Sequence, residues 1–503
     1  MSDVILDDRR LGILTPTFAR GGCEEYVIAL ARWAKTEGWS PTVCLPEVDG
    51  VATVRRDLAT HGIESAPLTA WERFTYSEDL FRQSRRETLR TIREQRFTRL
   101  VIVLPTIEFG GALIDAAAQT RIPTGVLYQL VPYRHTFDRL ERQIYSWARF
   151  QRQAWLTVSR QNRDVLCESL GWQQSAVDVV PNSLLQPIDA ASQSTRVQCR
   201  LQLRRELGLP PDSFIALTVA RLHVQKAHDV LIKAAAELAD RYPQLHLVWA
   251  GTGEIADQLH AQVVELGLSD RIHVLGHRTD VIDLLLPASD AFVLPSRFEG
   301  MPFAALEAMA AGLPSVLSDI GPHREIAGNG DAALLATVDD SNALARSMER
   351  LIVDPDLAVS IGATARRRAG EHAPGTGFQP LFHAIDHEVR VPRHPQRRWP
   401  LLDGAERRVA IFGAGVGGRK ALAELLPEDR VIAFLDNRAF DGEEQLHGIP
   451  VCRPDAIRDL SVDAVILASV HAGPMYHQLL ALGFPGERIE IFPIWRLLPP
   501  EEA

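Results

Sequence analysis

The residues from Phe292 to Gly312 read FVLPSRFEGMPFAALEAMAAG, and this stretch decides the expected fold. The apolar run that begins at Ala291 is typical of a buried strand in a parallel sheet, which Pro295 ends. A helix is predicted next, because Pro302 suits a first helical turn and Gly312 marks a helix end. The loop between strand and helix therefore turns backbone N–H groups and a positive helix end towards the crevice where open α/β sheets bind ligands.

Two carboxylates stand at this electropositive end, Glu299 in the loop and Glu307 in the helix, with seven residues between them. Phosphate is favoured at a helix N-terminus, whereas carboxylates accept hydrogen bonds from hydroxyl groups. The pair therefore indicates a polyhydroxylated ligand that carries phosphate. The alternative is that Glu299 caps the helix and Glu307 is a solvated helix position.

The pattern S-R-F-E-G-M-P-F-A-A-L-E-A-M-A-A-G-L-P resembles the donor-sugar motif of retaining glycosyltransferases of family 4, which have the two-domain GT-B fold. This resemblance implies that Glu299 binds hydroxyls of the transferred sugar and that Glu307 holds the ribose of the nucleotide. It also implies that the backbone of the segment between them contacts the donor, through Gly300, Met301, Pro302 and Phe303.

Composition agrees with a large enzyme of ordinary globular character. The 503 residues are 46% hydrophobic and 23% charged, and the length predicts about three domains. A net charge of -10 gives no reason to expect nucleic acid as a partner. Five widely spaced cysteines suggest neither a zinc site nor a disulfide framework, which favours a reducing cytoplasm. With no leader or long apolar run expected, the predicted location is the cytoplasm, and peripheral contact with the inner face of the membrane is left open.

Near the start of the chain, a strand is predicted from Leu11 to Thr15 and a helix from Glu24 to Lys35. The loop between them contains Gly21 and Gly22, which let backbone amides approach a ligand closely. Tight packing is the alternative explanation. The loop resembles the Gly-Gly turn that opens the acceptor domain in the same family.

A second alternating pattern begins with a strand from Phe214 to Val219. Arg221 and Lys226 follow this strand and can converge on one diphosphate, as an arginine fork and a compact charge. The chain has only four lysines, and this one stands where the family's R-L-x-x-x-K motif requires it. In the family, the strand ends that carry Gly251 and Gly253 frame the nucleotide.

Two positions depart from the family pattern. The histidine that usually follows the strand Thr124 to Tyr128 is replaced by Gln129. His135 could substitute for it, but an exposed loop histidine is the more common explanation of that residue. The later signature v-x-P-N-G ends here in Asn182 and Ser183. An arginine-rich segment, residues 76–99, is interpreted as a solvated helix face rather than a patch for anionic lipid.

The last hundred residues carry a separate signal. A strand from Val409 to Phe412 precedes a G-x-G-x-x-G loop, and an acidic residue ends the next strand about 20 positions on, as in dinucleotide-binding folds. The residues concerned are Gly413, Gly415, Gly418 and Asp436. The block also resembles the small nucleotide-binding domain that precedes the hexapeptide-repeat body of sugar O-acyltransferases, which makes a bound nucleotide a more natural expectation than hydride transfer.

We therefore predict an α/β protein of GT-B architecture, with two Rossmann-like domains and a small C-terminal Rossmann-like domain. The expected function is metal-independent, retaining transfer of a sugar from a UDP- or GDP-sugar to a carbohydrate, lipid-linked or protein acceptor in cell-surface glycan synthesis. No other cofactor is expected, and a homo-oligomer is left open. Alternatives are a nucleotide-sugar sensor, an NAD-dependent oxidoreductase and a glycoside phosphorylase. The predicted segments are an acceptor domain at 1–195, a donor domain at 196–388, a linker at 389–404 and the C-terminal domain at 405–503.

Overall fold

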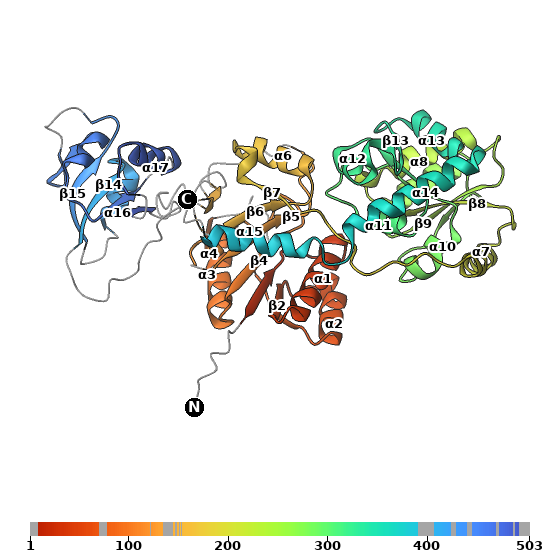
Figure 1. Cartoon of the computed structure of the whole chain (residues 1–503), viewed down its shortest axis with the longest axis horizontal. Helices are drawn as coiled ribbons and strands as arrows, with labels where there is room; N and C mark the ends of the chain where they lie inside the picture. Colours follow the sequence, from red (N-terminus) through yellow and green to blue (C-terminus); the bar gives the residue numbers. More distant parts are fainter. Residues whose placement is uncertain are drawn as a thin grey trace.

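The computed structural model describes three α/β units along the chain (Figure 1). The described residues are 9–69, 78–120, 122–133, 144–145, 148–149, 151, 153–390, 407–423, 429–439, 445–468, 472–485 and 488–491. His135 and almost all of the expected linker lie outside them.

The first domain is built on a parallel sheet of seven strands in the order β3-β2-β1-β4-β5-β6-β7. The strands are β1 (Arg10–Leu14), β2 (Ser40–Leu45), β3 (Glu64–Pro67), β4 (Arg99–Leu104), β5 (Thr124–Tyr128), β6 (Gln153–Thr157) and β7 (Asp178–Val179). Its described helices of at least two turns are α1 (Gly22–Thr36), α2 (Ala52–Thr60), α3 (Glu78–Glu94), α4 (Gly111–Ala118) and α6 (Arg160–Leu170). The central strands are buried along almost their whole length, because helices cover both faces of a parallel sheet.

The second domain repeats this plan with six parallel strands in the order β10-β9-β8-β11-β12-β13. The strands are β8 (Phe214–Val219), β9 (Leu245–Ala250), β10 (Ile272–Val274), β11 (Ala291–Leu294), β12 (Ser315–Ser318) and β13 (Leu334–Ala336). The helices are α7 (Gln193–Leu207), α8 (His228–Leu238), α9 (Ala256–Glu265), α10 (Leu286–Ala288), α11 (Phe303–Ala310), α12 (Gly321–Ala327), α13 (Ser341–Val353) and α14 (Pro355–Ala369). The predicted strands Phe214–Val219 and Ala291–Leu294 are confirmed to the residue.

The helix of the deciding stretch begins one residue later than predicted. Pro302 has extended backbone angles and is the N-cap of α11, so it precedes the first turn. Its carbonyl accepts the first helical hydrogen bond, from the N–H of Leu306 at 3.2 Å. Gly312 has a φ of +75°, as expected just beyond the end of a helix.

The helix α15 (Phe378–Arg390) returns the chain from the second domain to the first. Figure 1 shows it lying across the first sheet. The ring of Phe378 lies 5.3 Å from that of Tyr26 and 5.5 Å from that of Trp33, both on α1. Arg99 at the start of β4 forms an ion pair with Asp386 at 2.7 Å. The first domain is therefore completed by α15, which comes from the C-terminal end of the two-domain unit.

The C-terminal domain is a third, smaller α/β unit. Its sheet has the order β16-β17-β15-β14-β18-β19 and is parallel except for the pair β16 and β17. The elements are β14 (Arg407–Phe412), α16 (Val416–Ala423), β15 (Asp429–Leu435), β16 (Gln445–Leu446), β17 (Ile449–Cys452), β18 (Ala464–Leu467), α17 (Ala472–Ala481) and β19 (Ile489–Ile491). The predicted order of strand, glycine loop, helix and strand is confirmed.

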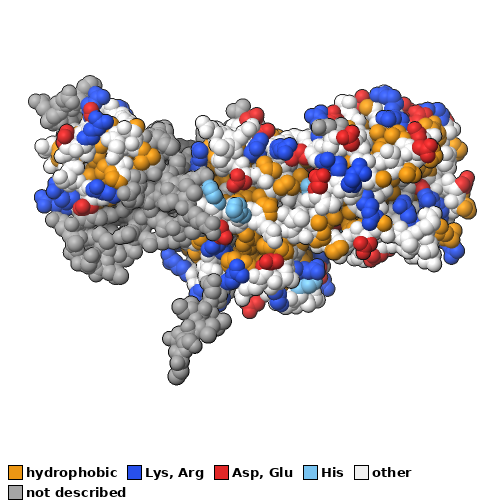
Figure 2. All heavy atoms as spheres, viewed as in Figure 1, with side chains coloured by type: hydrophobic (Ala, Val, Ile, Leu, Met, Phe, Trp, Pro, Cys, Tyr) orange, Lys and Arg blue, Asp and Glu red, His pale blue; other side chains and the backbone are white. Residues whose placement is uncertain are grey.

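The arginine-rich segment is largely the helix α3, and its arginines do not all face solvent. Arg85 is buried and forms an ion pair with the buried Asp115 at 3.4 Å, whereas Arg86, Arg90 and Arg93 are exposed. On the face shown in Figure 2, basic and acidic side chains are interspersed over both large domains. Among the described helices, none is both long and apolar enough to cross a bilayer.

The packing of α15 gives a stability prediction. Phe378→Ala removes a buried ring from the contact with α1, and we expect a loss of about 3 to 5 kcal/mol in the free energy of unfolding. Urea denaturation of the full chain measures this loss. The matched control is Val359→Ala, which truncates an exposed side chain on α14 and should change stability by less than about 0.5 kcal/mol. Equal effects of the two variants would contradict the inference that α15 holds the first domain together.

Candidate active site

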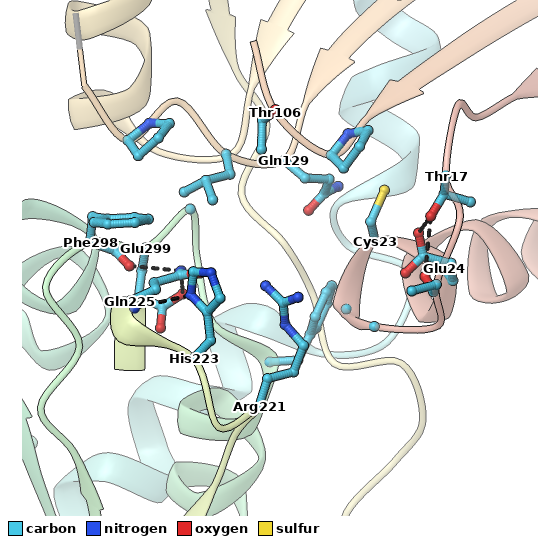
Figure 3. A pocket seen from close by; sticks show the side chains of 18 of the residues that line it. Thr17, Cys23, Glu24, Thr106, Gln129, Arg221, His223, Gln225, Phe298 and Glu299 are labelled. Carbon is cyan, nitrogen blue, oxygen red and sulfur yellow. Dashed lines mark hydrogen bonds between the residues drawn. The ribbon is translucent and has the colours of Figure 1, made fainter. Parts of the chain in front are cut away.

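A cavity of about 520 Å³ lies between the first and second domains, where the carboxyl ends of their strands face each other (Figure 3). Residues after β1, β4 and β5 line one wall, and residues after β8 and β11 line the other. Of the residues predicted for the large domains, the cavity is lined by Gly21, Gly22, Arg221, Lys226, Glu299, Gly300, Met301 and Phe303. The volume is in the range of small-molecule sites.

Glu299 is fixed by three donors on the wall of the second domain. Its carboxylate accepts hydrogen bonds from Lys226 Nζ at 2.5 Å and Ser296 Oγ at 2.7 Å through one oxygen, and from Gln225 Nε2 at 3.3 Å through the other. The side chains of Glu299 and Lys226 are only 6% and 15% exposed, so their charges compensate each other in a largely dry environment. Sequence reasoning chose both residues but did not anticipate that they pair.

Arg221 is the cation that remains open to the cavity. It is exposed, and among the described residues it has no ion-pair partner. Figure 3 shows its side chain extending from the loop after β8 into the space between the domains. A guanidinium in this position can bind phosphate oxygens in pairs.

Gly300 lies where the backbones of the two domains are in close contact. A Cβ at this residue would stand 1.8 Å from the carbonyl oxygen of Gln129, so no other residue fits without a shift of the backbone. Asn182 Nδ2 donates to Gln129 Oε1 at 3.1 Å and to the carbonyl of Met301 at 3.0 Å. Asn182 therefore joins the end of β5 in the first domain to the loop between β11 and α11 in the second.

Gln129, at the position where the family usually has histidine, lines the cavity and carries a buried donor beside it. Because Oε1 accepts from Asn182, the amide orientation is set and Nε2 is directed away from that bond. Nε2 is buried and has no hydrogen-bond partner among the described residues. Figure 3 shows the side chain of Gln129 on the wall opposite Arg221. A buried donor without a partner is costly, which makes Gln129 a candidate contact for a ligand oxygen.

Glu307 and Pro302 do not line this cavity. Glu307 is partly exposed on α11, and burial together with the negative charge of Glu25 on α1 raises its pKa to about 7. The two carboxylates belong to different domains, so their repulsion opposes close approach of α1 and α11 while both are ionised.

Gly251 and Gly253 are also absent from the cavity wall. A Cβ at Gly251 would stand 1.9 Å from the carbonyl oxygen of Ala220, and one at Gly253 would stand 2.1 Å from that of Leu222. These glycines let the loop after β9 pack against the residues on either side of Arg221. Through these contacts they hold in place the loop that carries Arg221.

The glycine loop of the first domain is organised by a residue that sequence reasoning missed. Glu24 is buried, and its carboxylate accepts a hydrogen bond from the hydroxyl of Thr17. Burial raises the pKa of Glu24, with the hydrogen bond from Thr17 opposing that shift. The signal was present in the sequence, because an acidic residue in the first turn of a helix, two positions after Gly22, suits the positive helix end.

In the C-terminal domain, the two ends of the glycine loop pack against each other. Gly413 has a φ of +115°, and a Cβ at Gly418 would stand 1.9 Å from its carbonyl oxygen, whereas Gly415 has open space around it. Asp436 Oδ2 accepts from the backbone N–H of Ala414 at 3.0 Å, and its other oxygen accepts from the N–H of Arg438 at 2.9 Å. Burial raises the pKa of Asp436, but these backbone hydrogen bonds outweigh it and hold the pKa below its usual value.

Within the described ranges, no group of three or more His, Cys, Asp or Glu side chains is arranged to hold a metal ion.

Solved structures share the arrangement of the first two domains. A glycosyltransferase from Rickettsia africae superimposes with a TM-score of 0.63 at 16% identity, over 76% of this chain and 99% of the other. HepE of Anabaena, solved in complex with UDP and glucose, gives a TM-score of 0.60 at 20% identity, over 75% of this chain and 99% of the other. The first two domains therefore have the GT-B fold, as predicted.

The sequence of the second domain matches a known family. Residues 200–368 match the family of glycosyl transferases group 1. The lipopolysaccharide core biosynthesis mannosyltransferase LpcC of Rhizobium leguminosarum bv. viciae is 36% identical over 165 residues, which are 32% of this chain and 46% of LpcC. The chain spans about half the length of the curated relatives it matches. The match covers the segment that carries Arg221, Lys226, Glu299 and Glu307.

The contrast between Arg221 and Lys226 gives a second prediction. Lys226→Ala leaves the buried carboxylate of Glu299 without its cation, and we expect a loss of about 3 kcal/mol in the free energy of unfolding. Arg221→Ala removes an exposed side chain and should change stability by less than about 0.5 kcal/mol. Urea denaturation of the two variants beside the wild type makes the comparison. Equal stability of both variants would show that the pair with Glu299 does not hold the loop.

Proposed function

We propose that this protein is a glycosyltransferase that moves a sugar from a nucleotide-sugar to an acceptor with retention of configuration and without a metal ion. The observation that carries this proposal is the convergence of Arg221, Lys226 and Glu299 with the N-terminal end of α11 on one cleft of a GT-B fold. The family match of residues 200–368 supports it. UDP is the first nucleotide to test, because HepE has been solved with UDP and glucose.

In the proposed reaction, negative charge develops on the departing diphosphate as the anomeric bond breaks. Arg221 and the backbone N–H groups at the start of α11 stabilise this charge, and Lys226, whose charge is shared with Glu299, lies beside them. Glu299, held by Lys226 and Ser296, presents its remaining lone pairs to hydroxyls of the transferred sugar. Gln129 Nε2 donates to the same sugar from the opposite wall.

Retention would follow from attack by the acceptor hydroxyl on the face that the diphosphate leaves. The acceptor oxygen forms the new bond to the anomeric carbon while the old bond to the phosphate oxygen breaks, and the acceptor proton passes to the leaving phosphate. In this scheme the first domain binds the acceptor. We place the products among cell-surface glycans, with the cytoplasm as the site of synthesis.

The proposal is tested by incubating the purified chain with UDP-, GDP-, ADP- and dTDP-sugars and measuring thermal stability. A ligand at 100 times its dissociation constant stabilises the folded state by about 2.7 kcal/mol. We expect one nucleotide-sugar to raise the melting temperature and its nucleotide to be released in solution. Binding without any release or transfer would favour the alternative of a nucleotide-sugar sensor.

The two carboxylates should separate nucleotide binding from sugar binding. We expect Glu307→Gln to weaken both free UDP and the UDP-sugar, and Glu299→Gln to weaken only the UDP-sugar, because Glu307 is assigned to ribose and Glu299 to the sugar. Ribose hydroxyls bond more strongly to the ionised carboxylate, and the pKa of Glu307 is raised to about 7. UDP affinity should therefore rise from pH 6 to pH 8 more in wild type than in Glu307→Gln, as calorimetry can measure. Unchanged UDP affinity in Glu307→Gln would remove the ribose assignment.

The diphosphate assignment concerns Arg221. Arg221→Ala should lower kcat by about a hundredfold or more, because the lost charge matters most in the transition state. Arg221→Lys should recover only part of this loss, since a lysine lacks the paired donors. EDTA should leave wild-type activity unchanged. Activity that disappears with EDTA and returns with magnesium or manganese would contradict the metal-free reaction.

For the C-terminal domain we propose a bound nucleotide or nucleotide-sugar at the loop from Gly413 to Gly418. In the full chain, Gly415→Val adds a side chain where the loop has open space, so it should block phosphate approach without a clash. We expect calorimetry to lose one of two binding events, while transfer by the GT-B domains continues. A single binding event in wild type, unchanged in Gly415→Val, would remove this proposal and leave an assembly surface as the remaining explanation.

A further inference from the structure

The wall of the cleft that belongs to the first domain carries exposed aromatic side chains. Phe18 and Tyr133 are each 51% exposed, and both line the cavity. Single exposed apolar residues are common on protein surfaces. Two exposed aromatic rings inside the cleft that faces Arg221 and Glu299 are a different case, because a ligand in this cleft would cover them.

Phe18 is held in its exposed position by its neighbours. Its ring lies 6.0 Å from that of Phe109, in a tilted arrangement. A Cβ at Gly50 would stand 2.0 Å from the carbonyl oxygen of Phe18, so the backbone is packed tightly from the other side. The hydroxyl of Thr17 is shared between Glu24 and the carbonyl of Ala19, which lies 3.2 Å away in a local turn around Phe18. The ring is thus presented to the cleft by a well-packed loop.

The turn after β4 places polar groups on the same wall. The N–H of Phe109 bonds to the carbonyl of Thr106 at 3.4 Å, and between them Glu108 accepts a hydrogen bond from the hydroxyl of Tyr133. Thr106 Oγ1 is buried and has no partner among the described residues. A hydroxyl can donate and accept, and a carboxylate can accept several hydrogen bonds. This wall therefore combines an aromatic face with a hydroxyl group and a carboxylate.

We propose that this wall is a saccharide subsite, in which a sugar ring of the acceptor stacks on Phe18 and its hydroxyls bond to Thr106 and Glu108. The negative face of an aromatic ring attracts the weakly positive C–H groups of a sugar ring, and the polar groups at its edge fix the orientation. The role of this saccharide as acceptor rests on the proposed glycosyltransferase function. The binding of the saccharide to the wall does not depend on that function.

Ligand-observed NMR on the full chain tests the subsite. With UDP present, the probes are the methyl glycosides of glucose, galactose, mannose and N-acetylglucosamine in both anomeric forms. We expect saturation transfer to the ring protons of at least one glycoside in wild type, and affinity about fivefold lower in Phe18→Ala, as expected for loss of an aromatic contact. Phe18→Trp should retain binding, and Thr106→Val should weaken it several-fold without a change in melting temperature.

The matched control is Leu201→Ala, which truncates an exposed apolar side chain on α7 that does not line the cleft. It should leave glycoside binding unchanged. No transfer to any glycoside in wild type, or equal affinity in wild type and Phe18→Ala, would overturn the subsite. UDP affinity measured on the same samples tests the proposed function separately. Glycoside binding that depends on Phe18 in a protein that does not bind UDP would support the subsite and contradict the nucleotide-sugar function.

Discussion

The cleft depends on the close contact between the loop that joins β11 to α11 and the end of β5. Gly300 packs against the carbonyl of Gln129, and Asn182 bonds to both sides, so the backbones of the two domains come into direct contact here. Side chains of Gln161 and Glu325 add further hydrogen bonds between the domains. This contact sets the distance between the wall that carries Arg221 and the wall that carries Phe18. A side chain at position 300 would separate both walls at once, so the donor and acceptor regions share one geometric constraint.

Among the described residues that line the cleft, Arg221 is the one arginine or lysine without an ion-pair partner. Lys226 is compensated by Glu299, and the first domain contributes Arg20, which is itself paired with Glu25 and Asp57. An anionic group that enters the cavity therefore meets Arg221 first. The buried pair beside it keeps the loop fixed, and a fixed loop loses little entropy when it binds a ligand. Specificity for a diphosphate would then come from the long side chain of Arg221 and the rigid N-terminal end of α11 near it.

Much of the fold follows from local sequence, because strands buried on both faces are continuous apolar runs. Phe214–Val219 and Ala291–Leu294 were predicted to the residue for this reason. The convergence of Arg221, Lys226 and Glu299 was also predictable, since all three follow the carboxyl ends of parallel strands. The contacts of Asn182 with Met301, 119 positions away, could not be derived, because nothing in local periodicity encodes which loops of two domains meet.

Other features of the site were hidden for physical reasons. Gly251 and Gly253 were interpreted as ligand-facing, but a glycine is required equally where two backbones touch, and the sequence does not distinguish these cases. Glu24 was overlooked because its importance comes from burial, which depends on tertiary packing.

The path of α15 has a consequence for how the three units move. Because this helix packs on α1 and pairs with Arg99, the chain leaves the two-domain unit from the first domain. The C-terminal domain is therefore tethered to the half that carries Phe18, and not to the half that carries Arg221. A short tether raises the local concentration of whatever the third domain holds near one partner rather than the other. Any molecule that binds to the C-terminal domain would thus stay attached to the first domain.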